Sequence, residues 1–235
     1  MNSAEGPRKE AKKMPIKSER EYRNMKIEVR EVQNPDGEER KLVSGYASTF
    51  DESYKLFDGD GWEYWEVVDR GAFDETDLSD VIMQYDHRGR VFARTRNNTL
   101  EVNPDDVGLF TQADLGGTEI GRELYEEIRG GYTDRMSFGF TVNGEFEERE
   151  KDENGIVKFT RHITKVGKLY DVSAVSIPAN DGTSIGADAV QRSLDVARDG
   201  VISRIDAERR QEAELELTRR RAEVKAKALS VGGDE

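Results

Sequence analysis

The chain has 235 residues, of which 36% are charged and only 35% are hydrophobic, a low hydrophobic content for a chain that is globular throughout. It has no cysteine, which excludes disulfides, thiolate metal sites and a cysteine nucleophile. The net charge of −13 lies mainly in the middle of the sequence, and an acidic body repels phosphate backbones. A groove for nucleic acid is therefore not expected.

The two ends of the sequence differ from its middle in apolar content. Residues 1–24 carry an excess of basic side chains and no apolar periodicity, which predicts a flexible basic arm. Apolar, aromatic and glycine residues concentrate between about Ile27 and Ile185, so one folded domain is expected at residues 25–185. The sequence shows no apolar run of about 18 residues and no apolar signal segment, which predicts a soluble protein that is neither secreted nor membrane-bound.

The first elements predicted within the domain are strands. Polar and apolar residues alternate over Lys26–Val32, and extended structure resumes at Lys41–Ala47 after the turn residues Asn34–Gly37, which predicts a β-hairpin. An aromatic-rich strand is expected over Trp62–Val68, and a short helix is expected at Asp74–Leu78.

The middle of the domain is predicted to hold four short strands and one helix. Turns rich in Asn and Asp separate the strands, which are expected at Val81–Tyr85, Phe92–Thr95, Leu100–Val102 and Leu109–Ala113. Residues Thr118–Ile128 have helical spacing of their apolar side chains, and two glycines follow, so a helix is expected to end there.

Two longer strands complete the predicted domain. Arg135–Val142 is strand-like, Glu145–Lys158 is a polar segment typical of a hairpin tip, and Phe159–Ile177 is the returning strand. Many short strands with few helices indicate an α+β fold, with a β-rich, curled or barrel-like, mostly antiparallel sheet and a few flanking helices.

Residues 186–235 have a different character. The first part has an apolar stripe at helical spacing, formed by Val190, Leu194, Ala197, Val201 and Ile205. Beyond Asp206 the Glu and Arg groups suit a solvated helix or a weak coiled coil. We predict a charged helical tail without a core of its own.

Ser137 is a candidate nucleophile, because it is a lone serine among large apolar residues in a strand-like run. Its hydroxyl either bonds to nearby backbone, faces solvent on the wet side of the strand, or attacks a substrate. Such a serine most often needs a histidine as its base, and the chain has two. His87 ends an apolar strand, where it faces either a cleft or solvent, and His162 lies in an alternating strand whose polar side would normally face solvent.

Asp171 is the candidate carboxylate for orienting such a base. It interrupts the apolar run Leu169–Val175, and a carboxylate in a buried strand costs on the order of several kcal/mol unless it is paired. Its partner is either a histidine, or backbone amides, or an arginine such as Arg135 or Arg161.

No cofactor or metal site is expected. The glycine pairs Gly116–Gly117 and Gly130–Gly131 bracket a predicted helix but lack the spacing of a phosphate-binding loop. The acidic turns at Asp51–Asp60 and Asp105–Asp106 lack the pattern of a calcium-binding loop.

Four segments taken together identify a resemblance. The order "QYDH", "DDVGLFTQADL", "ELYEEIRGGYTDRMSFGF" and "ITKVGKLYDVSAVSIPAN" resembles the prohead (capsid maturation) proteases of tailed bacteriophages, serine peptidases similar in fold to herpesvirus assemblin. The resemblance covers roughly Ile27 to Ser184. It implies that His87 is the base, Ser137 the nucleophile and Asp171 the third member, at a position where such proteases usually carry glutamate. Assemblin-type enzymes use a second histidine instead, which makes His162 the alternative third member.

The resemblance also implies a biological role. The expected protein is a serine endopeptidase that processes the scaffold segment or the major capsid protein inside the assembling prohead, in the cytoplasm of a bacterial host, and then cleaves itself. The tail at 186–235 is expected to interact with scaffold, to support self-association and to be removed by self-cleavage. The alternative is a non-catalytic capsid-assembly or scaffolding protein with a protease-like fold.

Overall fold

The computed structural model describes residues 10–13, 20–29, 32–33, 39–175 and 188–231. The chain divides into two units, Met1–Leu194 and Asp195–Glu235. The strands described are β1 (Glu10–Lys13), β2 (Glu21–Val29), β3 (Val32–Gln33), β4 (Glu39–Arg40), β5 (Leu42–Thr49), β6 (Tyr54–Gly59), β7 (Trp62–Val68), β8 (Ile82–Tyr85), β9 (Arg88–Arg94), β10 (Leu100–Pro104), β11 (Gly108–Asp114), β12 (Arg135–Lys151) and β13 (Val157–Val175). The helices are a 3₁₀ turn at Thr95–Asn97, α1 (Glu119–Arg129) and α2 (Asp188–Val231).

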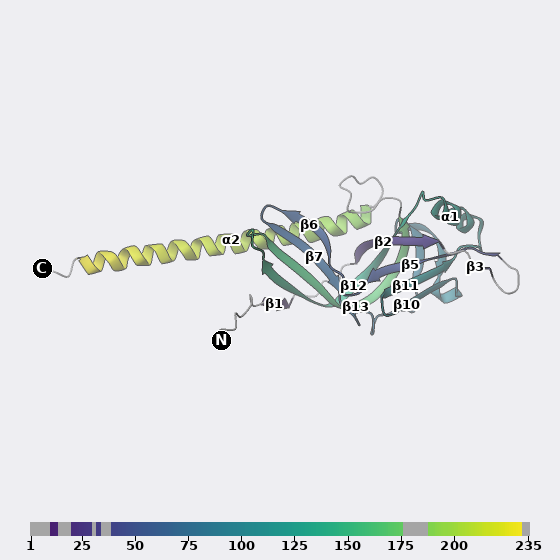
Figure 1. Cartoon of the computed structure of the whole chain (residues 1–235), viewed down its shortest axis with the longest axis horizontal. Coiled ribbons are helices and arrows are strands. Elements are labelled where there is room, and N and C mark those ends of the chain that lie inside the picture. Colours follow the sequence, from purple (N-terminus) through teal and green to yellow (C-terminus); the bar gives the residue numbers. More distant parts are fainter. Residues whose placement is uncertain (1–9, 14–19, 30–31, 34–38, 176–187, 232–235) are drawn as a thin grey trace. The chain divides into compact units, whose positions relative to one another are not determined.

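In the described part of the first unit, one large sheet holds 11 strands, and β3 and β4 form a separate pair. Its main path runs in the order β10-β11-β5-β2-β12-β13-β7-β6, and Figure 1 shows β2, β12 and β13 next to one another. Nearly all neighbours are antiparallel, but β13 pairs in parallel with β7 through its first half and with β8 through its second. Strand β9 also contacts β10 and β11, so the sheet is strongly curled. The predicted β-rich, curled and mostly antiparallel fold is confirmed.

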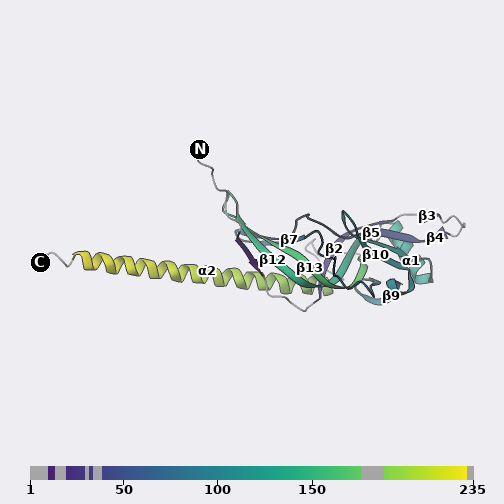
Figure 2. The same cartoon turned by 90° about the horizontal axis from the view of Figure 1, so that it is seen from below.

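The long ribbon of β12 and β13 forms the centre of the sheet, as seen from a second side in Figure 2. Its apolar face is buried in one hydrophobic core, with Met136, Phe138 and Phe140 from β12 and Leu169 and Val172 from β13. Helix α1, which was predicted at this place, packs Leu124, Tyr125 and Ile128 into the same core. The hydroxyl of Thr118 accepts a hydrogen bond from the Gly121 amide and caps its first turn.

Two predicted elements differ from the structure. Residues 74–78 form no helix: a turn ends at Glu75, and the backbone of Asp77 pairs with β13 through an isolated bridge to Lys168. The segment predicted as a hairpin tip is mostly strand, because β12 runs on to Lys151 and β13 begins at Val157. Buried acidic side chains on β12, including Glu145, make this part look polar in the sequence.

The predicted N-terminal arm also contains strands. Residues 10–13 form β1, which pairs with β12, and residues 21–24 belong to β2, which lies between β5 and β12 in the sheet. The expected boundary at residue 24 therefore falls inside a strand. The apolar pattern could not indicate this, because Glu21 and Arg23 are buried charged residues. Residues 1–9 and 14–19 lie outside the described part of the chain.

The second unit contains helix α2 beyond residue 194, which confirms the predicted helical tail. All described side chains from Arg209 to Lys225 are exposed, and these include the apolar residues Leu215, Leu217 and Val224. Arg220 and Glu216 form an ion pair one helical turn apart. Among the residues that the structure describes, no helix is long and apolar enough to cross a membrane.

Candidate active site

Strands β12 and β13 bring Ser137 and Asp171 to the same face of the sheet. In their register Ser137 lies opposite Ser173, and Gly139 lies opposite Asp171. Because successive residues of a strand point to opposite faces, the core residues Met136 and Phe138 leave Ser137 and Gly139 on the other face. Gly139 has no side chain, so β12 places none opposite Asp171.

His87 reaches this face from the turn between β8 and β9. Tyr85 pairs with Arg88, so Asp86 and His87 are the two residues of a tight hairpin turn, and both have positive φ angles of 49° and 57°. Two such residues in succession are the signature of a type I′ turn, which favours Asn and Gly. The amide of Asp86 donates a 3.0 Å hydrogen bond to the carbonyl of Ala174 and fastens the turn to β13. The left-handed conformation of a residue such as His87 costs about 1–2 kcal/mol.

The imidazole of His87 bridges the other two side chains. Its Nε2 lies 2.7 Å from Ser137 Oγ, and its Nδ1 contacts Asp171 Oδ1. A carboxylate only accepts hydrogen bonds, so Nδ1 carries the proton and Nε2 accepts from the serine hydroxyl. The side chains of His87 and Asp171 are 2% and 3% exposed, and Ser137 is completely buried. We call these three residues the Ser–His–Asp cluster.

Ser173 is a further polar contact that the sequence analysis did not single out. Its hydroxyl donates a 2.9 Å hydrogen bond to Asp171 Oδ1, the same oxygen that contacts the imidazole. The signal was present in the sequence, since residues two apart on a strand share a face. Asp171 and Ser173 are both buried in a strand whose other face holds Val172 and Ala174.

The residues considered as alternatives have other partners. His162 Nδ1 lies 2.8 Å from Asp69 Oδ1, and its ring stacks on Phe146 with 4.5 Å between the ring centroids. Arg135 Nε is 3.7 Å from Asp134, and Arg161 binds glutamates in a second buried cluster. The structure thus brings His87, Ser137 and Asp171 together and places His162 in a separate pair with Asp69.

This second cluster, which we call the ion cluster, consists of Glu21, Arg23, Glu66, Glu145 and Arg161. Arg161 binds Glu21 through two bonds of 2.6 and 2.8 Å, and binds Glu66 at 2.9 Å and Glu145 at 2.5 Å. Arg23 binds Glu66 at 2.6 Å and Glu21 at 2.9 Å. The cluster joins β2, β7, β12 and β13 beneath the surface of the sheet.

The charges in the ion cluster compensate for their burial. Burial alone would raise the pKa of Glu21, but hydrogen bonds and charges from Arg161 and Arg23 outweigh it and lower that pKa to about 2. The hydroxyl of Tyr54 contacts Glu66, and burial together with the charge of Glu66 raises the pKa of Tyr54 well above its ordinary value. Glu21 is therefore ionised and Tyr54 neutral at neutral pH.

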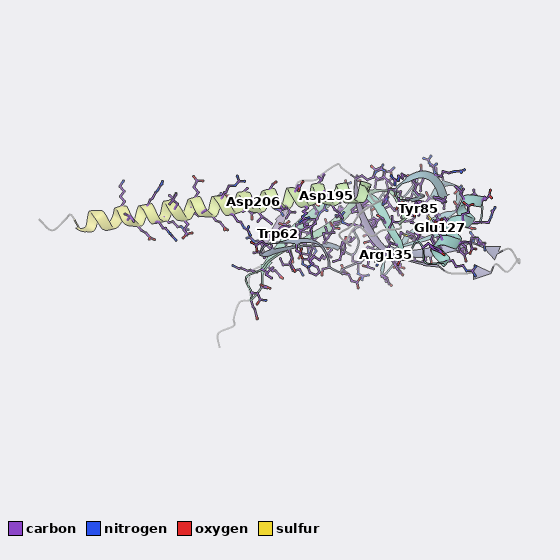
Figure 3. All side chains as sticks on the ribbon, turned by 90° about the horizontal axis from the view of Figure 1, so that it is seen from above. Trp62, Tyr85, Glu127, Arg135, Asp195 and Asp206 are labelled. Carbon is purple, nitrogen blue, oxygen red and sulfur yellow. The ribbon has the colours of Figure 1, made fainter. Side chains whose placement is uncertain are left out.

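A groove of about 440 Å³ adjoins the turn that bears His87. Figure 3 labels two of its lining residues, Tyr85 on β8 and Glu127 on α1. Asp86 and Arg88 also line the groove, whereas the His87 side chain between them is almost fully buried. The turn therefore has an open outer side and presents its imidazole inward.

The Ser–His–Asp cluster has the connectivity needed for acyl transfer. A hydroxyl within hydrogen-bond distance of an imidazole, which in turn binds a buried carboxylate, is the arrangement found on unrelated serine peptidase folds. It is recognised by this geometry and not by the order of the residues in the chain.

Comparison with known proteins gives the family. A search of the curated proteins and a search of the solved structures each found no match. A family model described as Caudovirus prohead serine protease matches residues 25–198, a span that includes His87, Ser137 and Asp171. Since this match covers most of the 235 residues, the chain belongs to the prohead serine proteases of Caudovirus, which are serine peptidases of capsid maturation.

Proposed function

We propose that Ser137, His87 and Asp171 are the catalytic residues of this peptidase and that its substrates are the scaffold segment and the major capsid protein of the assembling prohead. The observation that carries the catalytic assignment is the bridging imidazole, with Nε2 at 2.7 Å from Ser137 Oγ and Nδ1 against Asp171. The family supports the class of reaction and of substrate.

In the first half of the proposed reaction, Ser137 Oγ attacks the carbonyl carbon of the scissile peptide bond. His87 Nε2 takes the hydroxyl proton, and Asp171 stabilises the imidazolium through its contact with Nδ1. The tetrahedral intermediate collapses when His87 gives this proton to the leaving amine, so the C–N bond breaks and an acyl ester on Ser137 remains.

In the second half, water replaces the amine. His87 Nε2 accepts a proton from the water as its oxygen attacks the ester carbonyl, and returns that proton to Ser137 Oγ as the ester bond breaks. The product carboxylate leaves and the cluster is restored. Because Ser137 is completely buried in the structure described, residues around it have to move before a peptide reaches Oγ.

We further propose that the protein acts inside the prohead, in the cytoplasm of a bacterial host, and finally cleaves its own chain. The stretch of α2 from Arg209 to Lys225 supports this proposal, because all its side chains are exposed. Such a segment can unfold locally without loss of core packing, and a locally unfolded segment is accessible to cleavage. The same stretch offers exposed leucines and alternating charges for pairing with a scaffold helix or a second copy.

The test compares the full-length protein with its Ser137→Ala variant. Each is incubated with scaffold and capsid protein, and the fragments of substrate and of the enzyme itself are followed by mass spectrometry. The wild type is expected to cut both, and Ser137→Ala neither. Ser48→Ala, which removes another buried serine hydroxyl from the sheet, is the matched control and is expected to retain activity. Processing by Ser137→Ala at the wild-type rate would refute the assignment.

A further inference from the structure

We propose that Ser173 is a positioning residue of the peptidase, which holds the Asp171 carboxylate in the orientation that the His87 imidazole requires. This inference rests on the proposed roles of His87, Ser137 and Asp171. It adds a fourth side chain, which does not touch the substrate and acts through Asp171 alone.

Asp171 Oδ1 is an acceptor that two side chains share. It accepts a 2.9 Å hydrogen bond from the Ser173 hydroxyl and also contacts His87 Nδ1. Ser173 is completely buried, and a hydrogen bond is stronger in such an environment than in water. A hydrogen bond to a charged acceptor is stronger than one between neutral groups, and this bond holds the oxygen that the imidazole contacts.

Without a further contact, the Asp171 carboxylate would be free to rotate. The terminal torsion of an aspartate has a broad, two-fold energy profile, so the backbone alone does not fix the plane of the carboxylate. The residue opposite Asp171 on β12 is Gly139, which offers no side chain to hold it. The Ser173 hydroxyl lies on the same face of β13 and supplies this constraint.

The backbone of Ser173 is held on both sides. It pairs with Ser137 of β12 on one side and with Gln84 of β8 on the other. The strands that carry Ser137 and the hairpin of His87 therefore also fix the position from which the Ser173 side chain projects. A side chain on a backbone held in this way is suited to define the orientation of its neighbour.

The experiment measures peptide cleavage and the reaction of the nucleophile with a small fluorophosphonate, which reports on activation of the serine without peptide binding. Ser173→Ala is expected to lower kcat and the rate of fluorophosphonate labelling by about 10- to 100-fold, the equivalent of one hydrogen bond to a charged group, and to leave KM unchanged. Ser173→Cys keeps the shape with a weaker donor and should also lose activity. Ser48→Ala is the control for loss of a buried serine hydroxyl and should label at the wild-type rate.

The same substitutions in an Asp171→Asn background test whether Ser173 acts through Asp171. Ser173→Ala should then cause little further loss, since residues of one unit are not additive. The inference is overturned if folded Ser173→Ala or Ser173→Cys labels at the wild-type rate, or if the loss is the same in both backgrounds. The proposed function fails differently, through wild-type cleavage by Ser137→Ala or Asp171→Asn.

Discussion

The Ser–His–Asp cluster and the ion cluster are both buried on the ribbon of β12 and β13, but they differ in how their charge is compensated. The ion cluster sets three carboxylates against two guanidinium groups, and each arginine donates several hydrogen bonds to them. The Ser–His–Asp cluster has one carboxylate, which contacts an imidazole and a hydroxyl. In the ion cluster each carboxylate is paired with a guanidinium group. In the Ser–His–Asp cluster the hydroxyl proton of Ser137 lies between two groups that can exchange it.

The two clusters are separated by an irregular stretch of the ribbon. The register of β12 with β13 shifts at several places between Gly139 and Glu145, which is the mark of β-bulges. Asp171 lies on one side of this stretch and Arg161 on the other. On the proposed function, one end of the ribbon performs the chemistry and the other ties β2 to the sheet. Five experiments test this difference.

The largest effect is expected from the nucleophile and its base. Ser137→Ala and His87→Ala should each remove nearly all turnover, a loss on the order of 10⁶, and the double variant should lose little more. The unfolding free energy of Ser137→Ala should fall by no more than about 1–3 kcal/mol, because the buried imidazole loses one hydrogen bond but no large side chain or ion pair is removed. Strictly additive losses in kcat would show that the two residues do not act as a unit.

Two substitutions distinguish Asp171 from His162 as the third catalytic residue. Asp171→Asn keeps the shape but removes the charge that stabilises the imidazolium, and a loss of up to about 10⁴ in kcat is expected. His162→Gln, which alters the pair with Asp69, should change kcat far less. If His162→Gln abolished cleavage while a folded Asp171→Asn cleaved normally, the site would use two histidines.

Removal of the N-terminal residues tests how much the ion cluster stabilises the fold. A chain that begins at Glu21 keeps the ion cluster and should be nearly as stable as the full chain. A chain that begins at Met25 lacks Glu21 and Arg23 and the first part of β2, so Glu66 and Arg161 lose buried partners. It should be destabilised by more than the about 3–5 kcal/mol expected for one broken buried pair. Equal urea midpoints for the two chains would show that the domain does begin at residue 25.

A single substitution in the ion cluster should affect stability but not chemistry. Glu66→Gln removes a fully buried charge from two arginines and should lower the unfolding free energy by about 3–5 kcal/mol. The rate of fluorophosphonate labelling per folded molecule should remain that of the wild type. Glu101→Gln, an exposed position on β10, is the control and should change neither quantity. A slower labelling rate in folded Glu66→Gln would mean that the two clusters are coupled.

The smallest effect is the pH dependence of Glu21. Its pKa is lowered from 4.5 to about 2, so its contribution, about 3 kcal/mol, is present above pH 4.5 and is lost as the pH falls through 2. The difference in unfolding free energy between the wild type and Glu21→Gln should therefore shrink over this range. Urea titrations at pH 6, 4 and 2.5 measure it, and a difference that is constant with pH would contradict the pairing.

The sequence reveals the two clusters to different extents. Ser137, His87 and Asp171 stand out because each is a polar residue within or at the end of an apolar strand, and their motifs resemble one family. The ion cluster could not be predicted in this way, because Glu21 and Arg161 are 140 residues apart and charged residues in a strand normally indicate a solvent-exposed face. Pairing of this kind depends on the register of the whole sheet, which local patterns do not specify. The bond from Ser173 was not predicted although Ser173 and Asp171 share a face of one strand, and the left-handed turn at His87 was not predicted because Asp and His stand where such turns favour Asn and Gly.

The order of the strands has a consequence for when the enzyme becomes active during its synthesis. Strand β2 emerges early from the ribosome, but its neighbour β12 pairs Ser137 with Asn24, more than a hundred residues later, and β13 brings Asp171 last. Contacts of such high sequence separation form only after the intervening chain is available. A nascent chain therefore carries Ser137 without His87 and Asp171 in place until residue 175 has left the ribosome. If these three residues are catalytic, as we propose, the topology delays proteolysis until translation of the sheet is complete.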